Sequence, residues 1–307
     1  MHSTKNHIFT VQMANHCIAI ATPLEELIPH FSKTLRAYTD HISSHGFEEL
    51  PDAFITINKS AQSDSGKGRF AIVEVSFRKN LCLQPFSKTI RLVSSFKVFY
   101  YGYFEPIFHT ALRRLEVIPL HAISLFREGK GMLICGPGGA GKTTTALHLI
   151  QQGWHLLNDD DTYLVSQREK VFLWAPSGPL YITQDAVKRY PHLCGSHLGP
   201  LVRRGPELKY FWKNPESQGN RYFPPHFILF PEVAPKRKTR FQLLNQKETL
   251  LTLLSQKSRE QERMRKDLFA MSSTWKTFTS VANRVPAARL ILGHDLEQIP
   301  KVLKAIF

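Results

Sequence analysis

The segment MLICGPGGAGKTTTALHLIQQ, residues 132–152, holds the most specific pattern in the chain. Its first four residues are apolar and predict a short strand, after which residues 136–143 match G-x-x-x-x-G-K-T in full. From there to about Gln152 the apolar residues recur at helical spacing, and Gly153 stands where a helix ends. Strand, glycine-rich loop and helix in this order predict an α/β domain.

The residue types of this loop suit the binding of a phosphate chain. Glycines let backbone N–H groups surround a phosphate, and the helix N-terminus adds a positive potential. Lys142 would bring its charge to the β- and γ-phosphates, and the Thr143 hydroxyl would bind Mg²⁺. A glycine-rich turn that merely caps a helix would explain the glycines but not the Lys-Thr pair. We therefore expect ATP and Mg²⁺ as cofactors. The residues expected to bind them are Gly136, Pro137, Gly138, Gly139, Ala140, Gly141, Lys142, Thr143 and Thr144.

Three carboxylates, at positions 159–161, follow the loop after one helix and one predicted strand, residues 154–158. If that strand is a parallel neighbour of the strand before the loop, the acids and the loop reach the same edge of the sheet. Mg²⁺ held by Thr143 needs a further oxygen ligand, and a hydroxyl nucleophile needs a base. Two adjacent carboxylates could divide these roles. A solvated acidic turn is the alternative interpretation.

Composition narrows the class of protein. The chain has 307 residues, 42% of them apolar and 21% charged, which excludes a disordered chain or a small disulfide scaffold. A net charge of +15 favours phosphates, anionic peptides or nucleic acid as partners. No apolar run approaches the roughly 18 residues of a membrane span, so we expect a soluble cytoplasmic protein. The cysteines are far apart in the sequence and predict neither a disulfide framework nor a zinc site: Cys17, Cys82, Cys135 and Cys194.

The rest of the chain predicts two domains. Residues 1–105 read as a smaller α+β accessory or substrate-recognition domain, and residues 106–307 as the catalytic domain. Residues 176–225 are rich in Pro, Gly and basic residues, and we expect substrate-facing loops there. The other expected elements are strands within 8–21, a hairpin of 53–58 with 69–78, a strand near 89–94, helices over 23–37, 104–116 and 258–282, a hairpin of 120–126 with 132–135, a hairpin of 163–166 with 171–175, strands at 226–230, 239–244 and 287–292, and helices capped at Asn245 and Asp295.

Residues 121–165 resemble the kinase domain of bifunctional HPr kinase/phosphorylase, whose core is related to phosphoenolpyruvate carboxykinase. The likeness begins at His121 and runs through GPGGAGKTTTALHLIQQGWHLLNDD, residues 136–160; VPAARLILGHDL, residues 285–296, resembles the closing strand and helix of HPr-kinase-like proteins. The resemblance implies a mixed-sheet P-loop kinase domain. It also implies that Asp159 acts as acid/base on the acceptor hydroxyl, that Asp160 belongs to the metal site, and that His121 lies near the catalytic acid.

The sequence departs from that enzyme at several points. Gly138 and Thr143 stand where its loop has Ser, and no E-I-R-G-L-G-like signature follows the acids. We therefore do not carry over its phosphorylase activity or HPr as acceptor. The chain is more similar to the divergent kinases found beside ribosomal peptide biosynthesis genes, some of which phosphorylate a serine of a precursor peptide.

These observations predict an ATP- and Mg²⁺-dependent kinase that phosphorylates a Ser or Thr hydroxyl of a protein or peptide, such as an acidic peptide. A small-molecule alcohol kinase remains open, as does a nucleotide-regulated, nucleic-acid-binding ATPase that uses the basic residues 236–240 and 259–266. We expect no membrane partner, regard nucleic acid as the weaker alternative and leave a homo-oligomer open. The cations expected near the γ-phosphate or substrate are Arg203, Arg204, Lys209, Lys213 and Arg221.

Overall fold

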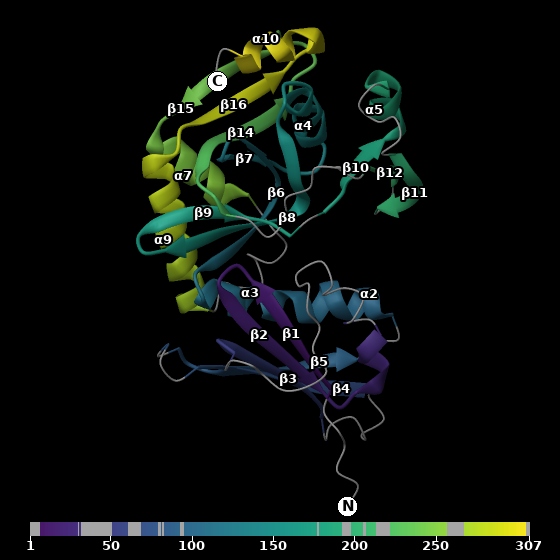
Figure 1. Cartoon of the computed structure of the whole chain (residues 1–307), viewed down its shortest axis with the longest axis vertical. Helices are drawn as coiled ribbons and strands as arrows, with labels where there is room; N and C mark the ends of the chain where they lie inside the picture. Colours follow the sequence, from purple (N-terminus) through teal and green to yellow (C-terminus); the bar gives the residue numbers. More distant parts are fainter. Residues whose placement is uncertain are drawn as a thin grey trace, which may run out of the picture. The chain divides into compact units, whose positions relative to one another are not determined.

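A computed structural model gives the fold of the chain as two compact units (Figure 1). The structure describes residues 7–29, 31, 51–60, 69–78, 81, 83–92, 95–176, 178–191, 198–204, 207–212, 222–256 and 267–304. The first unit comprises Met1–Leu115 with Arg263–Ala270, and the second comprises Glu116–Glu262 with Met271–Phe307. The division of function after residue 105 stays a prediction. None of the helices in the described ranges is both long and apolar enough to cross a membrane.

The first unit is built on a five-stranded sheet in the order β1-β2-β3-β4-β5. Its strands are β1 (His7–Met13), β2 (His16–Thr22), β3 (Ala53–Lys59), β4 (Arg69–Phe77) and β5 (Phe86–Leu92). Neighbours are antiparallel except β2 and β3, which are parallel. The predicted strand pair and hairpin are confirmed, whereas the strand expected near 89–94 begins earlier, at Phe86.

Helical segments and aromatic side chains complete the first unit. The helical segments are η1 (Glu25–Leu27), α2 (Phe96–Phe99), η5 (Tyr100–Phe104) and α3 (Glu105–Arg114). Phe31 is buried, with its ring 5.8 Å from that of Phe9 and 4.9 Å from that of Phe104. The helix expected over 23–37 begins as η1, and residues 32–50 lie outside the described ranges.

The second unit contains an eight-stranded mixed sheet in the order β13-β9-β8-β6-β7-β14-β16-β15. Its strands are β6 (Val117–Arg127), β7 (Lys130–Cys135), β8 (His155–Gln167), β9 (Lys170–Trp174), β13 (Tyr222–Phe223), β14 (Pro225–Val233), β15 (Arg240–Leu244) and β16 (Ala287–Leu292). β7, β14 and β16 are parallel neighbours, and the other neighbours are antiparallel. The expected mixed α/β character is thus confirmed.

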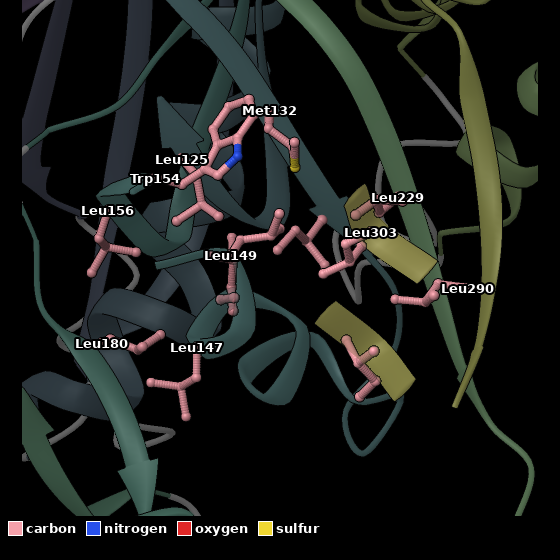
Figure 2. Close-up of a cluster of buried hydrophobic side chains, with 14 of the residues drawn as sticks. Leu125, Met132, Leu147, Leu149, Trp154, Leu156, Leu180, Leu229, Leu290 and Leu303 are labelled. Atoms are coloured by element: carbon pink, nitrogen blue, oxygen red, sulfur yellow. The ribbon is translucent and has the colours of Figure 1, made fainter. Parts of the chain in front are cut away.

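Helices cover both faces of this sheet. They are α4 (Lys142–Gln151), α7 (Gln246–Ser255), α9 (Leu268–Arg284), η7 (Leu296–Gln298) and α10 (Ile299–Lys304). On one face Leu147 and Leu149 of α4 pack with Leu290 of β16 and Leu303 of α10 (Figure 2). On the other face Phe278 belongs to a separate buried cluster, which also holds residues of α7. This two-sided burial holds β7, and with it the start of the glycine-rich loop, in the centre of the unit.

The segment expected to be irregular, residues 176–225, instead contains a second sheet. β10 (Leu180–Thr183), β12 (Glu207–Trp212) and β11 (Leu198–Arg204) lie in this order, antiparallel to their neighbours, and α5 (Gln184–Arg189) follows β10. Leu180, Ile182 and Trp212 are buried in the cluster that contains α4. Prolines and glycines suggested loops, but these apolar residues fix the sheet against the helix after the glycine-rich loop.

Two predicted helix starts had different outcomes. Asn245 and Glu248 form the expected capping box at α7, with each side chain accepting a hydrogen bond from the backbone N–H of the other residue. Asp295 does not cap its own helix; its Oδ1 accepts from the backbone N–H of Thr239 at 2.6 Å. The helix expected over 258–282 begins at Leu268, and residues 257–266 lie outside the described ranges.

Candidate functional site

The glycine-rich loop, Gly136–Thr143, joins the end of β7 to the start of α4. Gly139 and Gly141 have φ angles of +79° and +96°, which residues with a side chain rarely adopt. A Cβ atom at Gly141 would also collide with the side chain of Leu292, whereas one at Gly138 would meet nothing within 4 Å. The loop therefore follows a path that needs glycine at specific positions.

We expect Gly141→Ala to lower the free energy of unfolding by about 1–3 kcal/mol, because it combines a left-handed backbone with a clash in the core. Gly138→Ala, in the same loop, should leave stability within about 0.5 kcal/mol of the wild type. Urea denaturation of the two variants measures the difference. Equal stabilities would contradict the conformation that the structure gives Gly141.

Lys142 is the buried cation of the loop. Its side chain is 8% exposed, and its Nζ donates hydrogen bonds to the carbonyls of Gly136 at 2.7 Å and Pro137 at 3.3 Å. Burial lowers the pKa of Lys142, while the negative charges of Asp160 and Asp159 oppose that shift. Nearby Cys135 is buried, and burial raises the pKa of its thiol to about 12, so the thiol stays protonated at neutral pH.

The acid pair reaches the loop by a different route from the one expected. The sequence predicts a short strand at residues 154–158, which would bring the acids to the loop if it were a parallel neighbour of β7. In the structure β8 runs through all three acids, and β6 lies between β8 and β7. Ala122 of β6 is opposite Asp160 on one side and Cys135 on the other. The acids are therefore level with the beginning of the glycine-rich loop.

The two carboxylates have different surroundings. Asp159 is 9% exposed, and its Oδ2 accepts a hydrogen bond from the Tyr181 backbone N–H at 3.2 Å. Burial, reinforced by the charge of Asp160, raises the pKa of Asp159 to about 7. The Asp160 side chain is 34% exposed and its Oδ1 lies 3.2 Å from Nδ1 of His121, which is 53% exposed. One carboxyl group is thus poised to exchange a proton near neutral pH.

Asp160 interrupts the regular strand geometry at this point. In an extended strand, adjacent side chains point to opposite faces, which would separate the two carboxylates. Asp160 has a φ of +83°, an unusual value for a residue with a side chain, although Asp tolerates it better than most. Both acids act electrostatically on Lys142, so both carboxylates lie within range of its charge.

Asn158 belongs to the candidate site, although no sequence motif points to it. It is buried, its Nδ2 donates to the Pro176 carbonyl at 2.7 Å, and its Oδ1 accepts from the Asp161 N–H at 3.2 Å. Gly178 lies against this side chain, with no room for a Cβ atom. Asn158 thus ties the acid segment to the chain that leads into β10. Its position directly before the acids in the sequence is the one signal that could have indicated Asn158.

Of the predicted cations, Lys209 is brought to the site. It lies in β12 opposite Thr183, and its charge lowers the pKa of both Asp159 and Lys142. Its Nζ is 3.1 Å from Oε2 of Glu207. Arg203 is exposed on β11, opposite Leu208. The side chain of Arg204 and the whole of Lys213 and Arg221 lie outside the described residues.

Comparisons with known proteins bear on part of this site. A family profile described as "SynChlorMet cassette protein ScmC" matches residues 85–178, a range that includes the glycine-rich loop and the acid pair. The Hpr(Ser) kinase/phosphatase from Coxiella burnetii is 14% identical over 61% of this chain and 92% of its own, with a TM-score of 0.29. That TM-score does not establish a shared fold. A search of curated proteins found no match.

Proposed function

We propose that the chain is an ATP- and Mg²⁺-dependent kinase that transfers the γ-phosphoryl group to a Ser or Thr hydroxyl of a protein or peptide. The observation that carries this proposal is that the buried loop cation Lys142 lies within range of the charge of the buried Asp159. A glycine-rich turn or an acidic turn alone would need neither burial nor this proximity. The resemblance to the P-loop kinase domain of HPr kinase leads to the same assignment.

The glycine-rich loop and Lys142 would bind the phosphate chain. Backbone N–H groups at the start of α4 surround the β-phosphate, and the helix N-terminus favours its negative charge. The γ-phosphate competes with the Gly136 and Pro137 carbonyls for the Lys142 ammonium. Lys209 adds a second cation from the acceptor side, where its charge already acts on Asp159. Such positioning and charge neutralisation are the main contributions of a protein to phosphoryl transfer.

The donor set at the site fits Mg²⁺. In the described residues no cluster of three or more His, Cys, Asp or Glu could hold a metal ion unaided. Mg²⁺ bound with ATP needs less, because one or two protein oxygens supplement the phosphates and water. The Thr143 hydroxyl and the Asp160 carboxylate supply such oxygens. The ion would neutralise charge that develops on the transferred group.

Asp159 would act as the base. As the acceptor hydroxyl oxygen forms its bond to the γ-phosphorus, the bond from that phosphorus to the β–γ bridging oxygen breaks. The hydroxyl proton passes to a carboxylate oxygen of Asp159, and ADP leaves with the bridging oxygen. A base with a pKa near the working pH is suited to this transfer, and burial gives Asp159 a pKa of about 7.

The pH dependence of transfer should report this pKa. Because the base is active only as the carboxylate, kcat/KM should fall about tenfold per pH unit below a pKa of about 7 and level off above it. Initial rates across this range, at saturating Mg²⁺, measure the profile. A rate that stays constant through the neutral range down to the ordinary pKa of a carboxyl group would contradict this role of Asp159.

The direct test is transfer of labelled γ-phosphate from ATP and Mg²⁺ to candidate acceptors by the full chain. The acceptors are serine-containing precursor peptides, HPr and a set of small alcohols. Label on a peptide or protein Ser or Thr supports the proposal, and label only on a small alcohol favours a small-molecule kinase. ATP hydrolysis without any acceptor, together with salt-sensitive nucleic-acid binding, favours a nucleotide-regulated ATPase.

A further inference from the structure

The side of the glycine-rich loop away from the acids has its own exposed surface. β7, β14 and β16 are parallel and lie side by side, so their carboxyl ends meet at one edge of the sheet (Figure 1). Val233, the last residue of β14, is paired with Leu292, the last of β16. A Cβ atom at Gly141 would lie 3.5 Å from Cγ2 of Val233, yet Val233 is 50% exposed. This apolar side chain is therefore available beside the loop.

The sheet order separates this surface from the acids. β7 has β6 and then β8, which carries the acids, on one side, and β14 and then β16 on the other. A nucleotide whose γ-phosphate faced Asp159 and whose phosphate chain followed the loop would extend away from the acids. Its α-phosphate and nucleoside would then reach the side of β14 and β16. Open sheets of this kind place ligands at the carboxyl ends of their strands.

The chain after β14 forms a rigid turn with exposed cations. We call Lys236, Arg237 and Lys238 the basic turn; all three are exposed. The Arg237 N–H donates to the Ala234 carbonyl at 2.9 Å, and the Arg237 carbonyl accepts from the His294 N–H at 3.2 Å. The backbone of the turn is therefore held in place while its charges face solvent.

The next residues fasten the turn to the loop after β16. The Thr239 N–H donates to Asp295 Oδ1 at 2.6 Å, and the Gly293 N–H donates to Thr239 Oγ1 at 3.1 Å. Gly293 lies so close to the Arg237 carbonyl that no Cβ atom fits there. Asp295, predicted as a helix cap, is used for this attachment instead. A turn held at both ends can present cations to a ligand with little loss of backbone conformational entropy.

We propose that the nucleoside end of ATP binds on this surface, with the ribose against Val233 and the α-phosphate facing the basic turn. The inference rests on the proposed function, since it takes the phosphate chain to lie in the glycine-rich loop. An apolar contact for the sugar beside cations for the phosphate is the combination that a nucleoside 5′-phosphate requires. It also assigns a role to the basic turn, which takes no part in the proposed phosphoryl transfer at Asp159.

Photolabelling of the full chain with 8-azido-ATP locates the nucleoside directly. We expect ATP-protected label between Val233 and Lys238 or between Gly293 and Asp295. ATP-protected label on residues 178–212 would overturn this placement and leave ATP binding intact. If calorimetry detects no ATP binding to the wild type, the proposed function fails together with the placement.

A charge-matched pair of variants tests the basic turn. The triple variant Lys236→Gln, Arg237→Gln, Lys238→Gln should weaken ATP binding about tenfold and pyrophosphate binding less than about twofold, since pyrophosphate lacks the nucleoside end. The control variant removes the same charge from exposed positions of the first unit: Lys59→Gln, Lys88→Gln and Arg91→Gln. It should leave both affinities near the wild-type values. Equal losses in the two variants, or equal losses of ATP and pyrophosphate, would overturn the proposal.

Discussion

The Asp159→Asn variant should bind ATP as the wild type does and transfer its γ-phosphoryl group about 10²–10⁴-fold more slowly, the usual contribution of a positioned base. The amide has nearly the same shape and can still accept the hydrogen bond from the Tyr181 N–H, so the local geometry should survive. What it cannot do is take up the hydroxyl proton. Initial rates of label transfer at saturating ATP, together with calorimetric ATP binding, measure the two quantities separately.

Asp161→Asn is the matched control. It makes the same chemical change two positions further along β8, in a residue that is part-buried where Asp159 is buried. We expect transfer within about threefold of the wild type, the range of an ordinary surface substitution. Similar losses in both variants would mean that the acid segment as a whole, rather than Asp159 in particular, supports transfer. An unchanged rate in Asp159→Asn would remove the proposed base whatever the acceptor.

The Asp159→Asn variant should also be more stable than the wild type at neutral and higher pH. The pKa of Asp159 is raised from 3.8 to about 7 in the folded chain, so between these values the folded state binds more protons than the unfolded state. Stability therefore falls as the pH rises through this window, at about 1.4 kcal/mol per unit of pKa shift. Asparagine removes this loss. Urea denaturation near pH 8 and near pH 4 should show a gain only at the higher pH.

A gain in stability with a loss of activity would distinguish a functional carboxylate from a structural one. A carboxylate with a structural role should stabilise the folded state, so its removal should lower the free energy of unfolding. Burial of the Asp159 carboxylate beside the negative charge of Asp160 instead costs free energy that the fold must offset elsewhere. The positive φ of Asp160 is a further cost at the same place. Strain and a raised pKa at the same place therefore support the proposal that this segment of β8 serves function rather than the fold.

Local signals predicted the elements that depend on neighbouring residues. The hairpin of β6 and β7, the helix after Gly141 and the capping box at Asn245 each rest on contacts within a few residues, so the sequence contains their cause. The hairpin of β8 and β9 turns at Arg168 and Glu169, both with positive φ. In each case the chain positions next to one another determine the geometry.

Contacts between distant residues account for what the sequence did not reveal. Asp295 is bound by Thr239, 56 positions earlier, and a local pattern could only suggest that it caps the helix beside it. β8 continues through three acids because β6 pairs with it along its length, which overrides the low strand preference of Asp. Likewise Trp212 is buried in the same cluster as residues of α4, and this burial stabilises a sheet in a segment rich in Pro and Gly. The sequence pattern could indicate the acids as candidate site residues, but it could not indicate their hydrogen-bond partners, Asn158 for Asp161 and the Tyr181 N–H for Asp159.

Lys142→Ala should weaken ATP binding at least about a hundredfold, because Lys142 is the only residue of the glycine-rich loop whose side chain would bring a positive charge to the proposed phosphate site. The free energy of unfolding should change much less than the free energy of ATP binding. Removing a buried cation with a lowered pKa relieves a desolvation cost, although the carbonyls of Gly136 and Pro137 lose their donor. Calorimetric titration with ATP and Mg²⁺, and denaturation of the same preparations, separate the two effects.

The comparison with Asp159→Asn then decides between two accounts of the site. If Lys142 holds the phosphates and Asp159 acts on the acceptor, Lys142→Ala removes ATP binding and transfer together, whereas Asp159→Asn removes transfer alone. A control for charge is Lys130→Ala, which deletes an exposed lysine at the opposite end of β7 and should leave ATP affinity unchanged. Retained ATP affinity in Lys142→Ala would mean that the glycine-rich loop binds no phosphate. The charges of Lys142 and the acids would then have no role in phosphate binding, and the kinase proposal would fail.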